Sequence, residues 1–156
     1  MSSSEANVVA IAIDASGNAN EAYEWYFKHI HGEKNTVVLI HVVETPSLPT
    51  LSLTEGLAPP VHEWERILTE QREKVTKLEN NYSSDLLQRK VKHKLCFVTG
   101  NPGEQIVATA LKEGASMIVM GTRGLGTIRR TFLGSVSDYV LNHAKIPVIT
   151  IPCKGD

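Results

Sequence analysis

The chain has few residues of the kinds that mark a disulfide framework or a metal site. It contains two cysteines, Cys96 and Cys153, and six histidines without the spacing of metal ligands. Such cysteine usage predicts neither a disulfide scaffold nor a bound metal cluster, and it fits a reduced intracellular setting. We interpret Cys96 as a small buried apolar residue and expect no catalytic role for any histidine.

Long apolar runs and a strong net charge are also missing. The longest apolar run has about six residues, whereas roughly 20 are needed to span a bilayer. Residues 1–6 are serine-rich, resemble no signal peptide or lipidation signal, and are expected to be disordered. The formal net charge of -1 provides no overall field that would attract nucleic acid or an anionic membrane. We therefore expect a soluble, cytoplasmic protein with neither partner.

What the sequence does contain is a regular alternation of short apolar runs and helical patterns. Its 156 residues suit a single domain, which we expect to cover residues 7–153. Val8–Ile13 and Thr36–Val43 are continuously apolar, as strands buried on both faces should be. Val91–Val98 looks like a less buried strand near an edge, and Met117–Met120 and Pro147–Ile151 complete the set. This α/β alternation predicts a parallel sheet with right-handed crossovers and helices on both faces.

Two helices and one connection have distinctive patterns. Asn18 and Glu21 form a capping-box pattern at the start of the first helix. A long helix begins near Pro60, and its apolar stripe predicts a helix laid on the sheet rather than a coiled coil, because Gln71 interrupts the stripe. The preceding segment, Glu44–Pro60, carries four of the seven prolines. It is longer than most strand–helix connections, which is typical of a functional or a mobile loop.

The segment Gly121–Ser137 carries the clearest chemical signal. Three glycines within six residues follow a buried strand, and Gly134-Ser135 then opens a helix. Glycine allows close approach of a ligand to the backbone, and the free N–H groups of a helix N-terminus favour a phosphate. No Gly-Lys-Ser/Thr follows, so this is not a Walker A loop, and its place after the fourth strand excludes the usual dinucleotide fingerprint. A flexible glycine-rich loop is the alternative interpretation.

The spacing Gly121, two residues, Gly124, nine residues, Gly134-Ser135 resembles the nucleotide motif of the ATP-binding branch of the universal stress protein family. The resemblance covers nearly the whole chain. It implies a single-domain open twisted five-stranded parallel sheet in the order 3-2-1-4-5, with helices on both faces. This arrangement is Rossmann-like, of the adenine nucleotide alpha hydrolase-like type. The matching segments include Ile11–Asp14, Leu39–Val42, Gly100–Pro102, Ile118–Gly121, Leu133–Val136 and Ile146–Ile149.

The resemblance also implies a ligand, ATP or AMP, with Mg²⁺ or Mn²⁺ allowed beside the phosphates. Asp14 has an alternative role as a cap of the turn into the first helix, and Arg123 as a solvated loop charge. The residues that the resemblance assigns are Ala12, Ile13, Asp14 and Val42 around adenine and ribose, Met120, Gly121, Arg123 and Gly124 on the ribose and phosphate side, and Gly134, Ser135, Val136 and Ser137 at the phosphates.

The expected function is that of a nucleotide-binding stress-response or signalling module. The alternatives are a slow ATP-hydrolysing enzyme and an apo interaction domain. Adenylyl transferases of related architecture carry His-x-x-His after the first strand, where this chain has Ala15–Asn18, which disfavours transfer chemistry. The last strand, Val148–Ile151, is an apolar sheet edge that needs a cover. The family pairs this strand with its copy in a second subunit, so a homodimer is expected.

Overall fold

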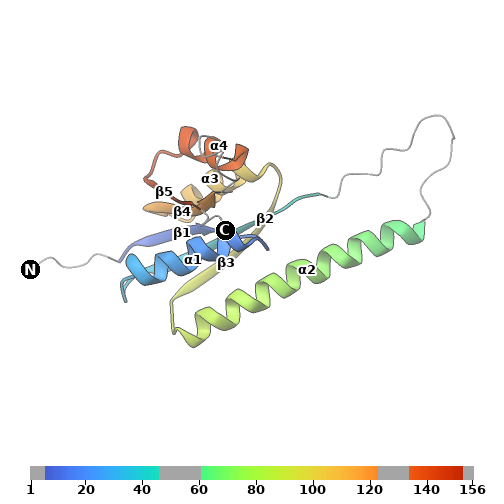
Figure 1. Ribbon diagram of the computed structural model, residues 1–156, viewed down its shortest axis with the longest axis horizontal. Helices are drawn as coiled ribbons and strands as arrows, with labels where there is room; N and C mark the ends of the chain where they lie inside the picture. The colour runs from blue at the N-terminus through green and yellow to red at the C-terminus, as the bar shows by residue number, and fades with distance from the viewer. Residues whose placement is uncertain (1–5, 46–60, 123–133, 153–156) are drawn as a thin grey trace, which may run out of the picture.

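Strands and helices alternate along the chain as the sequence predicts. The structure is a computed structural model that describes residues 6–45, 61–122 and 134–152. Figure 1 shows the sheet with its flanking helices. The elements are β1 (Val8–Ala12), α1 (Gly17–His29), β2 (Thr36–Val43), α2 (Val61–Gln88), β3 (His93–Thr99), α3 (Pro102–Lys112), β4 (Met117–Thr122), α4 (Ser135–His143) and β5 (Val148–Pro152).

The five strands form one parallel sheet in the order β3-β2-β1-β4-β5, which confirms the expected topology. β1 lies at its centre, where Ile11 pairs with Leu39 of β2 on one side and with Val119 of β4 on the other. β3 and β5 are the two edges. Strand order reverses between β1 and β4, and in open α/β sheets such a reversal marks the place where ligands bind.

Helices cover both faces of the sheet, which explains why the central strands are apolar throughout. Alternate side chains of a strand point to opposite faces. Val9 and Ile11 therefore join a core cluster with residues of α1 and α2, whereas Ala10 and Ile40 join a cluster with residues of α3 and α4. Figure 1 shows the two helix pairs on opposite sides of the strands.

The first helix begins earlier than the capping-box pattern predicts. Its N-cap is Ser16, whose Oγ accepts a hydrogen bond from the N–H of Ala19 at 3.3 Å. Asp14 Oδ1 in turn accepts from the N–H of Ser16 at 2.7 Å. The prediction that Asn18 and Glu21 start this helix is wrong, because the Oγ and the carbonyl oxygen of Ser16 accept from the N–H groups of Ala19 and Asn20, which makes Ser16 the N-cap.

Helix α2 packs on the sheet only through its second half, so the prediction of a helix laid along the sheet is only partly right. Leu78, Tyr82 and Leu86 are buried, but Val61 is 69% and Leu68 40% exposed. Length explains the overhang: 28 residues of α-helix span about 42 Å, whereas the eight residues of β2 span only about 26 Å. Figure 1 shows the first half of α2 extending past the sheet.

Some predicted features fall outside the described ranges. These are the N-terminal residues 1–5, the proline-bearing insert 46–60, and Cys153. Among the helices that the structure describes, none is both long enough and apolar enough to cross a membrane.

Candidate functional site

A cavity of about 580 Å³ lies at the carboxyl ends of β1, β2 and β4, beside the point where the strand order reverses. Its size is in the usual range for small-molecule sites, roughly 300–1,000 Å³. Arg123 and Gly124, two of the twelve predicted site residues, lie outside the described residues. The other ten all line the cavity: Ala12, Ile13, Asp14, Val42, Met120, Gly121, Gly134, Ser135, Val136 and Ser137.

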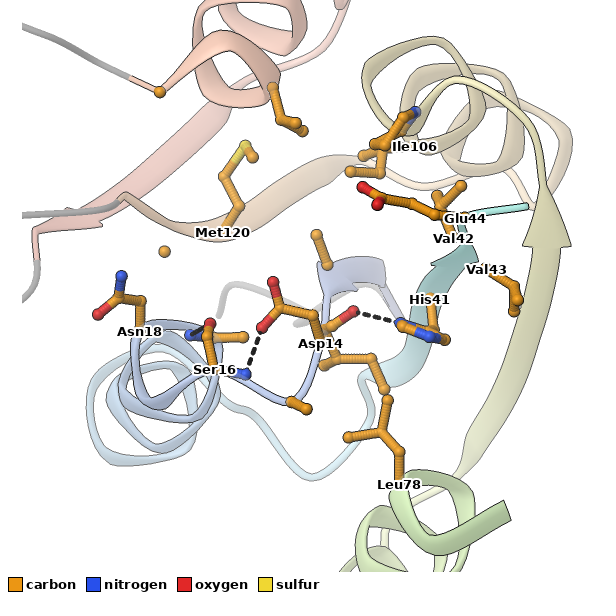
Figure 2. Close-up of a pocket in the computed structure, with 18 of the residues that line it drawn as sticks. Asp14, Ser16, Asn18, His41, Val42, Val43, Glu44, Leu78, Ile106 and Met120 are labelled. Atoms are coloured by element: carbon orange, nitrogen blue, oxygen red, sulfur yellow. Dashed lines mark hydrogen bonds between the residues drawn. The ribbon is translucent and has the colours of Figure 1, made fainter. Parts of the chain in front are cut away.

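Asp14 stands at the end of β1, where the chain turns into α1. One of its carboxylate oxygens accepts the hydrogen bond from Ser16, so the turn-capping role considered for Asp14 is present. Figure 2 shows the other carboxylate oxygen pointing away from Ser16. That oxygen can accept a hydrogen bond from a ligand hydroxyl, so capping and ligand binding are compatible.

His41 holds the backbone at this corner of the cavity. Its Nδ1 lies 3.0 Å from the carbonyl oxygen of Ile13, which can only accept, so Nδ1 carries the proton. Figure 2 shows this bond joining β2 to the end of β1. The Ile13 N–H donates to the Ile40 carbonyl at 2.9 Å. His41 is therefore a hydrogen-bonded strand residue, and its place in the cavity wall was not predicted.

Gly121 lines the cavity, but the backbone of α1 fills the space where its side chain would lie. A Cβ at this position would lie 2.4 Å from the carbonyl oxygen of Asn18 in the first turn of α1. The absent side chain therefore lets α1 approach β4, rather than keeping the way clear for a ligand as the sequence suggested. This contact brings Asp14, Ser16 and the start of α1 against the cavity.

The N-terminus of α4 opens onto the cavity without a side-chain cap. Its N-cap is Gly134, and a Cβ there would meet no atom within 4 Å. The first backbone bond of the helix runs from the Asp138 N–H to the Gly134 carbonyl at 2.9 Å. The N–H groups of Ser135, Val136 and Ser137 precede it and have no acceptor inside the helix. Together with the positive end of the helix dipole, these donors suit an anion.

Apolar side chains form another part of the wall. Ile13 and Met120 are 5% and 4% exposed, and Val42 and Ile106 line the same cavity. Figure 2 shows Met120, Val42 and Ile106 around the space above Asp14. A flat apolar ring fits such a wall, because burying its faces removes apolar area from water.

Helix α2 also lines the site, which no sequence pattern predicted. Gln71, Lys74, Val75 and Leu78 line the cavity, and the Gln71 side-chain amide donates a hydrogen bond to the carbonyl oxygen of Glu44. Sequence reasoning used Gln71 only as the residue that breaks an apolar stripe. No local pattern predicts this part of the wall. Packing of the C-terminal half of α2 determines which of its turns meets the end of β2.

Metal-binding side chains do not gather anywhere in the described ranges. No group of three or more His, Cys, Asp or Glu residues there could hold a metal ion.

Comparison with known proteins gives relatives over nearly the full length of the chain. "Universal stress protein YxiE" of Bacillus subtilis is 26% identical over 145 residues, which cover 93% of this chain and 98% of the relative. The solved structure of MJ0577 from Methanocaldococcus jannaschii matches with a TM-score of 0.65 at 26% identity, covering 96% of this chain and 98% of that one. A universal stress protein family protein from Arabidopsis thaliana, solved with AMP bound, matches with a TM-score of 0.68 at 18% identity, covering 96% and 94%.

A family model agrees with these relatives. The model of the universal stress protein family matches residues 6–152, which include every described strand and helix. The chain therefore belongs to the universal stress protein family.

Proposed function

We propose that this protein binds an adenine nucleotide, ATP or AMP, in the cavity at the carboxyl ends of β1, β2 and β4. The observation that carries the proposal is the uncapped N-terminus of α4, which faces a cavity that also has apolar side chains in its wall. Phosphate and base demand opposite surroundings, and this cavity supplies both. The AMP-bound structure from Arabidopsis thaliana, which shares the fold, supports the choice of ligand.

The arrangement of the walls suggests one orientation of the nucleotide. The phosphates would meet the N–H groups of Ser135 to Ser137, and the base would pack on the apolar side chains near Val42 and Met120. The ribose then lies beside Asp14, whose second carboxylate oxygen can accept from a hydroxyl. Arg123 and Gly124 remain proposed contacts on the phosphate side. Mg²⁺ or Mn²⁺ would bind mainly through the phosphate oxygens.

Binding without rapid turnover is the expected activity, consistent with a stress-response or signalling module. Fast hydrolysis needs an oriented water and a general base. In the part of the chain that the structure describes, the carboxylates lining the cavity are Asp14 and Glu44, and Asp14 is already engaged with Ser16. We expect at most slow ATP hydrolysis, which phosphate release with and without Mg²⁺ would measure.

Calorimetry on the purified protein tests the proposal directly. ATP and AMP should bind, and GTP should bind more weakly, because its purine ring carries different hydrogen-bonding groups. Mass spectrometry of small molecules released by denaturation should find ATP or AMP. If no adenine nucleotide binds at millimolar concentration and none is released, the proposed function is wrong.

Substituting Gly134 separates ligand binding from folding. The position has φ -57° and ψ 156°, which any L-residue adopts, and its surroundings are open. In Gly134→Asp the carboxylate would cap the helix N–H groups, raising the free energy of unfolding by about 0.5–1 kcal/mol. It would also repel the phosphates, so we expect ATP affinity to fall at least about tenfold.

Gly134→Asn is the matched control, since it caps the same N–H groups without a charge. It should weaken ATP binding less than Gly134→Asp does, and both variants should bind adenosine like the wild type. Unaltered ATP affinity in both variants would mean that the phosphates do not lie at α4.

We also propose that the protein is a homodimer joined through Val148–Ile151. β5 is an edge strand, and its residues are mostly half-buried. An apolar edge with unpaired backbone groups is readily covered by a second copy related by a two-fold axis.

A further inference from the structure

A second cavity, of about 610 Å³, lies between α1 and α2 and adjoins the proposed nucleotide site. The two cavities share one border, made of Asp14 to Ser16 on one side and Lys74 and Leu78 of α2 on the other. One ligand can therefore occupy both. A mononucleotide needs only the first, which already has the volume of an ordinary small-molecule site.

Two of the three acidic side chains that line the second cavity, Glu24 and Asp85, are paired. Asp85 accepts hydrogen bonds from the Tyr23 hydroxyl and from Arg89 Nε, both at 2.6 Å. The Arg89 guanidinium also donates to both carboxylate oxygens of Glu24, at 2.8 and 2.9 Å. The single positive charge of Arg89 offsets one of these two negative charges, so the pair opposes an anion in the cavity less than two free acids would.

The basic side chains of the second cavity, by contrast, are available. Lys74 and Lys77 line it from α2. Within the described ranges neither ammonium group has a carboxylate at ion-pair distance. The cavity therefore presents two cationic groups next to the polar border at Asp14, where the proposed orientation puts the ribose.

The aromatic residues of this cavity do not favour a second base. Tyr23 and Tyr82 are 1% and 7% exposed, and their rings pack edge-on against each other with centroids 4.9 Å apart. No open ring face remains on these two residues for stacking. A small anionic group suits the cavity better than a second aromatic ring.

We infer that the site accepts adenosine nucleotides that carry a second phosphate on the ribose, held by Lys74 and Lys77 in the cavity between α1 and α2. This inference rests on the proposed function, because the nucleotide must first occupy the site at α4. The second phosphate would leave the ribose on the Asp14 side, away from the phosphates at α4.

Calorimetry with AMP, adenosine 2′,5′-bisphosphate and adenosine 3′,5′-bisphosphate tests the inference. At least one bisphosphate should bind about fivefold more tightly than AMP at low salt, because each exposed charge pair contributes modestly. The gain should shrink as salt is added. Adding inorganic phosphate should not tighten AMP binding, because a separate ion loses its own translational freedom when it binds.

Lys77→Met locates the second phosphate, because Lys77 lines the second cavity and not the proposed nucleotide cavity. It should reduce the affinity advantage of the bisphosphate over AMP to about twofold and leave AMP affinity unchanged. Lys34→Met is the matched control, since residue 34 precedes β2 at the opposite end of the sheet. It should change neither affinity.

The outcomes distinguish the two proposals. If AMP does not bind, the proposed function fails and takes the inference with it. If AMP binds and neither bisphosphate is tighter, only the inference is wrong. A bisphosphate gain that survives Lys77→Met, or that Lys34→Met also removes, overturns the assignment of the phosphate to this cavity.

Discussion

Glycines that look equivalent in the sequence have different surroundings in the fold. Gly121 was expected to let a ligand approach the backbone, and Gly134 to open the helix whose N–H groups face the phosphates. A Cβ at Gly121 would instead strike the Asn18 backbone, whereas one at Gly134 would meet nothing within 4 Å. Gly121 is therefore a packing residue whose effect on the site is indirect, and Gly134 is the position where an added side chain meets only the cavity.

Gly121→Ala should destabilise the protein by about 1–3 kcal/mol, because a rigid backbone carbonyl cannot make room for the methyl group. Gly17→Ala is a suitable control. Gly17 is the first residue of α1 and has open surroundings, so alanine there should be neutral or slightly stabilising. Urea unfolding of both variants measures the difference. Equal stability of Gly121→Ala and the wild type would contradict the close packing of α1 on β4.

At the scale of elements, the C-terminal half of α2 packs on the protein, and the turns before it line the site. Arg89, just past its C-terminus, bridges Asp85 and Glu24 and lies with its guanidinium carbon 4.6 Å from the centre of the Phe27 ring. Leu78, Tyr82 and Leu86 bury the adjoining turns. This packing determines where Lys74 and Gln71 meet the cavity, so α1 and α2 position the wall together.

The packing of α2 should make stability fall at alkaline pH. Burial, followed by the nearby carboxylates of Asp14, Glu24 and Asp85, raises the pKa of Tyr82 from 10.0 to about 12. Above pH 10 the unfolded phenol loses its proton while the folded one keeps it, so the folded state binds more protons. The contribution of Tyr82 is therefore complete below pH 10 and is lost as the pH rises to 12, by about 2–3 kcal/mol.

Urea unfolding of the wild type and Tyr82→Phe between pH 8 and pH 12 isolates this effect. Other groups titrate alike in both proteins, so the difference between them reports Tyr82. The free energy of unfolding of the variant should rise relative to that of the wild type as the pH rises from 10 to 12. Parallel curves would show that the hydroxyl of Tyr82 titrates normally in the folded state.

At the scale of the whole molecule, the exposed edge at β5 sets the expected assembly. Light scattering should give about twice the chain mass of 17.1 kDa if two copies pair there. Thr150 is central in β5, so a two-fold axis would bring the two copies of residue 150 close together. Thr150→Glu should then yield monomers, because like charges directly opposite each other are destabilising.

Thr150→Gln is the control for side-chain size and should remain dimeric. Circular dichroism should show both variants folded. A wild-type protein that is monomeric at micromolar concentration, or a Thr150→Glu variant that stays dimeric, would contradict pairing through β5.

Local sequence was enough for the features that depend on short-range chemistry. The apolar runs of β1 and β2 predict strands buried on both faces, and both faces are covered. Gly134-Ser135 predicts the start of a helix, and α4 begins at Ser135. The order of the strands came from the family resemblance, and the structure confirms it. The resemblance also named ten of the described residues that line the cavity.

Tertiary structure alone decided the features that depend on how far elements reach. The stripe on α2 looks uniform in sequence, yet only the half that overlaps the shorter strands is buried, and one turn beyond it supplies Lys74 and Gln71 to the cavity. The role of Gly121 likewise depends on Asn18, more than 100 positions earlier in the chain. Periodicity and motifs report what a residue does to its near neighbours. Which distant residues become its neighbours follows only from the packing of the whole domain.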